Sequence, residues 1–229
     1  MISWLSPIVS VFNTLLTDLF QLTHDWGLAI IALTLIVRLL FTGLNLMNYR
    51  QMVRQKAVQP ILQQAREKYK DKQDRLLEET LRINKEHGIK PFNMLLISFA
   101  QIPIFMSLFG LFRTHGGDMS STIVSWVDTL SQTDPLHVLP ILSALLTLAT
   151  ALIPITMELT ILQAAKKQAG LSIVMNLIYL FVLWRSPIAI GLYYASSAVF
   201  ALMEKLVYRT KWGQKLLYRG IQVPVEAAS

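Results

Sequence analysis

WGLAIIALTLIVRLLFTGLNLM, residues 26–47, is an apolar run of membrane length with one arginine, Arg38, inside it. At ~1.5 Å rise per residue, a helix of this length covers roughly 33 Å, about the thickness of a bilayer core. Arg38 then lies near mid-membrane, where a charged side chain costs about 2.5–3.5 kcal/mol on insertion scales. We therefore expect Arg38 to face protein or water rather than lipid, and a water-filled cavity is the first hypothesis.

The alternative is that Arg38 belongs to a buried ion pair. None of the 14 Asp and Glu residues lies inside an apolar run, and only Glu158 and Glu204, at the ends of predicted spans, are placed to reach it. This distribution favours a functional charge in a hydrated pocket over a structural salt bridge. The two interpretations predict different mutant phenotypes.

The composition places the chain among integral membrane proteins. Its 229 residues are 53% hydrophobic and 15% charged, and the mean hydropathy is +0.47. The length suits a single domain, residues 1–229. The absence of cysteine excludes disulfides, thiolate metal sites and a cysteine nucleophile. No basic segment followed by a short apolar core precedes the first span, and whether Met1 is the original start stays open.

Two segments flank the first span. Residues 2–22 carry an apolar stripe of helical period opposite a polar face, which predicts an interfacial amphipathic helix or, equally, a helix packed on the bundle. Residues 48–90 are highly charged and predict two helices, with a boundary at Gln59-Pro60. His87-Gly88 should close this cytoplasmic hairpin.

The two predicted hairpin helices should meet through apolar side chains. Those expected to face one another are Ile61, Leu62 and Ala65 on one side and Leu76, Leu77, Leu81 and Ile83 on the other. Eleven basic and six acidic residues share the segment. Because the acids interleave with the bases, nucleic-acid binding is not expected, and a solvated charged face is the simplest interpretation.

The fold predicted is an all-α integral membrane protein with five transmembrane helices. The spans are residues 26–47, 91–111, 137–157, 171–184 and 188–206, followed by a basic tail, 207–229. Eighteen of the 21 Lys and Arg residues fall on one side of this arrangement. The positive-inside rule makes that side the cytoplasm, so we expect the amino terminus outside and the carboxyl terminus inside.

The spans carry binding groups rather than catalytic ones. All four histidines fall in loops or at span edges, and no metalloprotease, intramembrane aspartate or phosphate-loop motif is present, so neither an enzyme nor a cofactor is expected. Uncharged polar residues are scattered through the spans, and most are expected to join helices by hydrogen bonds. With Arg38 they are also placed to line a groove; the candidates are Thr34, Asn93, Gln101, Asn176 and Tyr179.

The order of these parts resembles the YidC/Oxa/Alb family of membrane protein insertases. The matching residues are WGLAIIALTLIVRLL (26–40), Gln59-Pro60 with the charged segment 62–91, QIPIF (101–105) and SPIAIGLYY (186–194). The absence of a large domain before the core is similar to the short, Gram-positive type. The resemblance implies a groove open to cytoplasm and lipid, with Arg38 attracting acidic parts of nascent chains while the apolar segment slides into lipid along spans 91–111 and 171–184.

The same resemblance implies partners and a location. Nascent membrane proteins would be the substrates, the tail and hairpin would contact the ribosome, and the Sec translocon is a further candidate. The location would be the bacterial cell membrane. Two other classes stay open: a small anion transporter or channel subunit that binds its anion at Arg38, and an assembly factor in which Arg38 pairs with a partner's acid.

Overall fold

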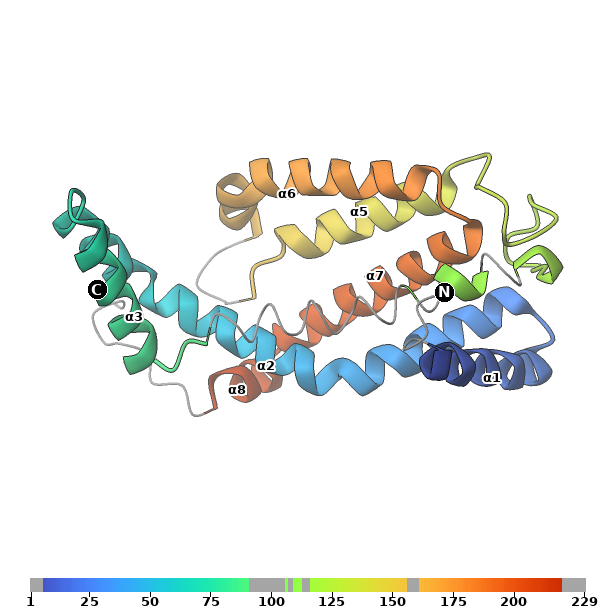
Figure 1. Cartoon of the computed structure of the whole chain (residues 1–229), viewed down its shortest axis with the longest axis horizontal. Coiled ribbons are helices and arrows are strands. Elements are labelled where there is room, and N and C mark those ends of the chain that lie inside the picture. Colours follow the sequence, from blue (N-terminus) through green and yellow to red (C-terminus); the bar gives the residue numbers. More distant parts are fainter. Residues whose placement is uncertain (1–5, 91–105, 107–108, 113–115, 156–160, 220–229) are drawn as a thin grey trace. The chain divides into compact units, whose positions relative to one another are not determined.

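The computed structural model describes residues 6–90, 106, 109–112, 116–155 and 161–219, and of 6, 116, 161–169 and 171 the backbone alone (Figure 1). The described part is helical, and within it extended pairing is limited to one bridge between Thr133 and Pro187. Two compact units are present. The first comprises residues 1–41 and 100–207, and the second comprises 42–99 and 208–229.

The first unit is a bundle of apolar helices. Its elements are α1 (Ser6–Thr23), the start of α2 (Trp26–Lys68), the 3₁₀ turn η2 (Gly116–Asp118), α5 (Val138–Leu152), α6 (Ile161–Trp184) and α7 (Ile188–Tyr208). α5 packs along α6 (Figure 1). By length and composition, α2 and α7 are long and apolar enough to cross a membrane, and α5 and residues 172–184 of α6 are shorter apolar helices.

The core of this unit joins α1, α2 and α7. Leu16 of α1, Leu33 of α2 and Ile190 of α7 are all buried in one apolar cluster. Phe20 stacks on Trp26 with ring centroids 4.0 Å apart, which fixes the sharp turn between α1 and α2. The predicted amphipathic helix therefore has a packed face, and the structure contains the helical pattern predicted for residues 2–22 over Ser6–Thr23.

The loop before α5, residues 116–137, is held in place by hydrogen bonds to two buried carboxylates. Asp25 is 6% exposed and accepts hydrogen bonds from the Ser121 hydroxyl at 2.6 Å and from the Thr122 amide and hydroxyl at 2.7 Å each. Its Oδ1 also accepts from the amide of Leu28, 3.0 Å away, so that Asp25 caps the start of α2. One side chain thus joins the loop to the first apolar helix.

The second carboxylate, Asp134, does the same for α5. It is 3% exposed and accepts from the Trp126 indole N–H at 3.0 Å and from the Leu139 amide at 2.9 Å. The loop also supplies backbone acceptors to α7, because the amide of Ala189 donates to the carbonyl of Leu130. The loop therefore satisfies the starts of α5 and α7, and it binds Asp25, which satisfies the start of α2, so that the cost of unpaired amides is removed at all three ends.

The second unit is a helical hairpin with a short terminal helix. It contains the rest of α2, α3 (Gln73–Glu86) and α8 (Lys211–Tyr218). Val58, Ala65, Ile83 and Ile89 form its buried core. As predicted, His87-Gly88 closes the hairpin: Gly88 has φ +62°, its amide donates to the carbonyl of Lys85, and the Ile89 amide donates to that of Asn84.

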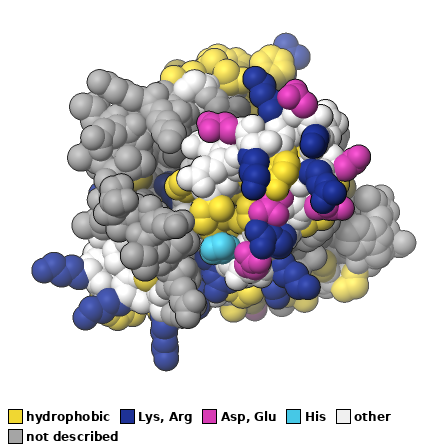
Figure 2. Space-filling model, turned by 90° about the vertical axis from the view of Figure 1, so that its left-hand side faces the viewer, with side chains coloured by type: hydrophobic (Ala, Val, Ile, Leu, Met, Phe, Trp, Pro, Cys, Tyr) yellow, Lys and Arg dark blue, Asp and Glu magenta, His cyan; other side chains and the backbone are white. Residues whose placement is uncertain are grey.

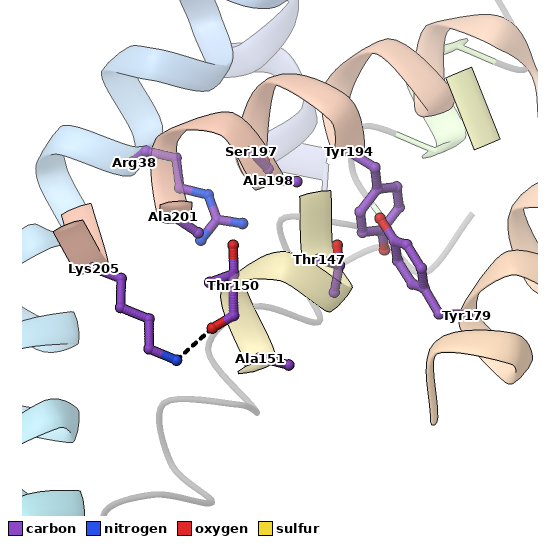
Figure 3. Close-up of a pocket in the computed structure, with 10 residues that line it drawn as sticks. All are labelled: Arg38, Thr147, Thr150, Ala151, Tyr179, Tyr194, Ser197, Ala198, Ala201 and Lys205. Carbon is purple, nitrogen blue, oxygen red and sulfur yellow. Dashed lines mark hydrogen bonds between the residues drawn. The ribbon is translucent and has the colours of Figure 1, made fainter. Parts of the chain in front are cut away.

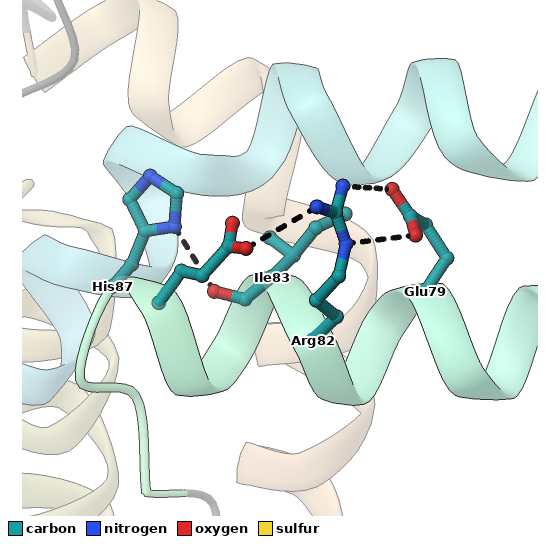
Figure 4. A network of polar contacts seen from close by, with 5 residues as sticks. Glu79, Arg82, Ile83 and His87 are labelled. Carbon is teal, nitrogen blue, oxygen red and sulfur yellow. Dashed lines mark hydrogen bonds and ion pairs between the residues drawn. The ribbon is translucent and has the colours of Figure 1, made fainter.

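Polar side chains cover the outside of the hairpin. Figure 2 shows Lys and Arg mixed with Asp and Glu on this face. Arg82 bridges Glu79 and Glu86 on the same helix, with closest N–O distances of 2.7 and 3.3 Å (Figure 4). The bidentate contact lowers the pKa of Glu79. These groups are exposed, so the network contributes solubility more than stability.

The structure corrects two predictions about the hairpin. The helix does not break at Gln59-Pro60, because α2 is continuous from Trp26 to Lys68. Pro60 is exposed, and the packing of Ile61 and Leu62 on the hairpin core offsets the hydrogen bond that proline cannot donate. Leu77 and Leu81 were expected in that core but are 61% and 57% exposed, since Leu76 and Ile83 define the buried face.

Helix ends differ from prediction elsewhere. The span predicted over 137–157 is a helix only to Leu152, because Ile153 is extended ahead of Pro154. α6 begins at Ile161, ten residues before the predicted 171. In the tail, α8 was not predicted; Thr210 caps it by accepting from the Gly213 amide, and Arg50 donates to the Leu216 carbonyl at 2.7 Å. The span predicted over 91–111 lies largely outside the described residues.

Replacing Asp25 with alanine should destabilise the first unit. The change leaves the Thr122 and Leu28 amides without their acceptor, and such losses cost about 1–3 kcal/mol each. We expect a lower unfolding temperature for Asp25→Ala in detergent, measured by circular dichroism, whereas Asp18→Ala on the exposed face of α1 should behave as the wild type. Equal unfolding temperatures for both variants would contradict the capping role.

Stability should also depend on acid pH through Asp25. Burial raises the pKa of its carboxyl group, but hydrogen bonds from Ser121, Thr122 and Leu28 outweigh burial and hold the pKa well below the ordinary range. A carboxylate with a depressed folded-state pKa stabilises the fold above its unfolded pKa of about 3.9, and this contribution is lost as pH falls below that value. Asp25→Asn should flatten the acid limb of the unfolding temperature measured against pH.

Candidate functional site

A pocket of about 360 Å³ opens between the helices of the first unit (Figure 3). Arg38 reaches it from α2, Tyr179 from α6, and the remaining lining comes from α5 and α7. The lining residues are Arg38, Thr147, Thr150, Ala151, Tyr179, Tyr194, Ser197, Ala198, Ala201 and Lys205. Among the described residues, this lining holds two cations and several hydroxyls and no carboxylate.

One stripe of α7 forms a wall of the pocket. Tyr194, Ser197, Ala198, Ala201 and Lys205 follow the spacing that brings side chains onto one helix face. The three central residues are small, so the space beside them stays open between the tyrosine and the lysine (Figure 3). The sequence of α7 thus creates the hollow without a break in the helix.

The opposite wall carries hydroxyl groups from α5 and α6. Thr147 and Thr150 supply hydroxyls from α5, and Tyr179 supplies a phenol from α6 whose ring meets that of Tyr194 edge to face with centroids 5.4 Å apart. Electrostatic interaction connects Arg38 with both phenols. Hydroxyl groups hydrogen-bond with water and with a cation such as Arg38, which favours a hydrated rather than a lipid-filled space.

The two cationic side chains of the lining, Arg38 and Lys205, belong to different helices. Arg38 is partly buried on α2. Lys205 is 8% exposed in the last turn of α7, and its ammonium donates to the carbonyl of Thr150 at 2.5 Å. That carbonyl belongs to the final turn of α5, where the helix dipole favours positive charge.

Of the six residues proposed from sequence, the structure brings Arg38 and Tyr179 together in this pocket. Thr34 is 1% exposed and donates to the Ile30 carbonyl of its own helix at 2.7 Å. Asn176 donates to the Ala144 carbonyl at 2.9 Å and joins α6 to α5. Thr34 and Asn176 thus serve the helices and are not part of the lining, while Asn93 and Gln101 lie outside the described residues.

Eight of the ten lining residues were not among the six candidates chosen from sequence, and three of them matter most for the site. Lys205 lies at the end of the predicted span 188–206, Ser197 was one of the scattered polar span residues, and Tyr194 was noted only as part of SPIAIGLYY. The signal that could have found them is the α7 stripe itself, in which Ser197 and Ala201 lie two turns and one turn before Lys205 on one face.

The fold and the pocket define a class: an all-helical membrane protein that keeps a cationic, hydroxyl-lined pocket among its apolar helices. A family model described as "60Kd inner membrane protein" matches residues 18–215. The chain therefore belongs to this family of membrane protein insertases, which is the YidC/Oxa/Alb family that the sequence resembles, and it is not a family of enzymes.

Curated relatives agree with this assignment. "Membrane protein insertase YidC" of Actinobacillus succinogenes is 29% identical over 96% of this chain and 38% of its own length. The protein of the same name from Methylobacillus flagellatus is 32% identical over 61% of this chain and 25% of its own. The chain thus spans well under half the length of these relatives.

A solved structure supports the same fold. The structure titled "Active YidC insertase crystal structure with the first transmembrane domain resolved" matches with a TM-score of 0.65 and 26% identity. The match covers 88% of this chain and 46% of that one. The all-α class predicted from sequence is confirmed by this likeness.

The stability of Arg38→Met separates a functional charge from a structural ion pair. Breaking a buried pair by removing one partner costs about 3–5 kcal/mol. We expect no such loss, because an arginine kept for binding is not needed for the fold, so the unfolding temperature of Arg38→Met in detergent should equal or exceed that of the wild type. Arg185→Met, exposed between α6 and α7, is the matched control. A fall in Arg38→Met alone would identify the structural pair.

Proposed function

We propose that this protein is a membrane protein insertase, which takes polar or acidic segments of nascent membrane proteins into the pocket and releases the apolar segment into the bilayer. The observation that carries the proposal is Arg38, a cation from an apolar helix that lines an open pocket with hydroxyl groups. A unit charge pair ~4 Å apart is worth about 1 kcal/mol in water and about 4 kcal/mol at an effective dielectric of 20. Attraction of this size is suited to a transient cargo.

The apolar part of the cargo would leave along α6. This helix exposes large apolar side chains on the side away from α5, and they are 45–79% exposed. They are Ile173, Val174, Met175, Leu177, Ile178, Phe181 and Val182. In a membrane such a face is in lipid, so a segment whose polar end is held near Arg38 can lie against α6 and partition into the bilayer.

The topology proposed has five spans in the bacterial cell membrane, with the amino terminus outside and the carboxyl terminus in the cytoplasm. The concentration of Lys and Arg in residues 50–90 and 205–219 supports this orientation. The hairpin and the basic tail would then meet the ribosome, and the Sec translocon is a further proposed partner. The tail helix α8 presents Lys211 and Lys215 on exposed positions, as such a contact requires.

Insertion by reconstituted protein tests the role of Arg38. The substrate is a single-span protein with an acidic tail that must cross the membrane, and tail protection from protease measures insertion. Arg38→Ala should lower insertion by about tenfold or more, corresponding to about 1.4 kcal/mol of lost attraction, and Arg38→Lys should retain most activity. Wild-type insertion by Arg38→Ala would contradict the mechanism.

The same vesicles distinguish an insertase from a small anion transporter that uses Arg38 as its binding charge. A transporter predicts saturable flux of a small anion such as chloride, with loss of that flux in Arg38→Ala. An insertase predicts no flux above that of empty vesicles while the acidic-tailed substrate is inserted. A passive assembly factor predicts neither anion flux nor insertion. It predicts a stable stoichiometric complex with the substrate instead.

A further inference from the structure

In the described part of the pocket lining, the titratable groups are Lys205, Arg38 and the two tyrosines. Lys205 comes from the cytoplasmic end of α7 in the proposed topology, and its ammonium is held by the Thr150 carbonyl. A lysine that only capped α5 would not need to face the cavity. Its place in the lining beside Ala201 makes it a second fixed positive charge of the same site (Figure 3).

The spacing of the two charges follows from helix geometry. Arg38 lies 12 positions after Trp26, at the start of α2, and Lys205 lies 17 positions after Ile188, at the start of α7. Loop 116–137 holds both helix starts. With ~1.5 Å rise per residue, Lys205 is roughly 7 Å farther along the bundle than Arg38.

A buried hydroxyl in the same pocket lining points to a ligand. Ser197 is 1% exposed and lines the pocket two turns before Lys205, and among the described residues its Oγ has no hydrogen-bond partner. A buried polar group without a partner costs about 1–3 kcal/mol. A carboxylate or water that occupies the pocket would supply the missing partner.

We propose that Arg38 and Lys205 form a two-cation site that selects translocated segments carrying two closely spaced carboxylates. Acidic residues at i and i+2 of an extended chain point to the same side and lie roughly 7 Å apart, since each residue advances 3.2–3.4 Å, so both can enter one pocket. The pocket volume is at the lower end of ordinary ligand pockets, about 300–1,000 Å³, so it accepts side chains of a short segment and not a folded domain. This inference rests on the proposed insertase function and specifies its substrate class.

Two substrates that differ by one charge test the inference. Both are single-span proteins with the same translocated tail, one with a single Asp and one with Asp at i and i+2. For the wild type we expect about five- to tenfold more efficient insertion of the two-Asp tail, which corresponds to about 1–1.4 kcal/mol. Lys205→Gln should remove this preference, so that the two-Asp tail is inserted no better than the one-Asp tail, while Lys205→Arg should keep it. Lys215→Gln, the same change on exposed α8, is the matched control.

The outcomes separate a recognition role from a capping role. If Lys205→Gln lowers insertion of both tails equally, together with the unfolding temperature, Lys205 only caps α5 and the inference is wrong. Wild-type preference in Lys205→Gln also overturns it. If instead the wild type inserts neither tail, the proposed insertase function fails and the inference falls with it; if Arg38→Gln inserts both tails as the wild type does, the charge mechanism at Arg38 fails and so does the two-cation site.

Cross-linking gives a second readout that does not depend on complete insertion. The chain has no cysteine, so Ala201→Cys introduces one thiol between the two cations, and Met203→Cys introduces one on a face that is 50% exposed outside the pocket. On addition of a thiol oxidant such as copper–phenanthroline, a two-Asp tail with Cys at i+4, which points to the same side of an extended chain as the two carboxylates, should form a disulfide with Ala201→Cys and not with Met203→Cys. Adding Lys205→Gln should reduce this cross-link by about five- to tenfold. Equal cross-linking with and without Lys205 contradicts the two-cation site.

Discussion

A positive charge at mid-membrane depth is the constraint on which the rest of the first unit depends. Exposing Arg38 to lipid would be energetically costly, so the neighbouring helices must leave a cavity around it and supply polar side chains. The chain meets this need with small residues on α7, hydroxyls on α5 and the phenol of Tyr179 on α6. The apolar cluster of the unit, formed with α1, α2 and the start of α7, borders the pocket through Tyr179 and Tyr194. Arg38 therefore explains why a bundle of such apolar helices contains a pocket at all.

The loop 116–137, which contacts the starts of α2, α5 and α7, determines which end of the pocket is closed. Asp25 and Asp134 cap α2 and α5, and the loop backbone accepts from the first amides of α7. With these ends satisfied by protein groups, that end of the bundle is closed by a fixed structure rather than by water. Lys205 and Thr150 lie near the other ends of α7 and α5. In our account the pocket is therefore open towards the cytoplasm and closed towards the outside.

Sequence patterns predicted most of the fold because helix period, Pro and Gly act locally. The Schellman turn at Gly88 and the buried partners Leu76 and Ile83 follow from such local rules. The continuity of α2 through Pro60 does not, because packing on α3 outweighs the lost hydrogen bond. The pocket was harder to predict from the sequence than the helices. Arg38 is conspicuous as a charge in an apolar run, whereas Lys205 gains its role only because Thr150, 55 residues earlier, is brought beside it.

One measurement tests the central claim, a hydrated pocket open to one side. Ala198→Cys places a thiol in the pocket, and Val199→Cys, one residue on, places it on an exposed apolar face. In vesicles of known orientation, a membrane-impermeant maleimide should label Ala198→Cys from the cytoplasmic side only and Val199→Cys from neither side. Labelling of Ala198→Cys from both sides would indicate a channel, and labelling from neither side would indicate a dry core; either result contradicts the account.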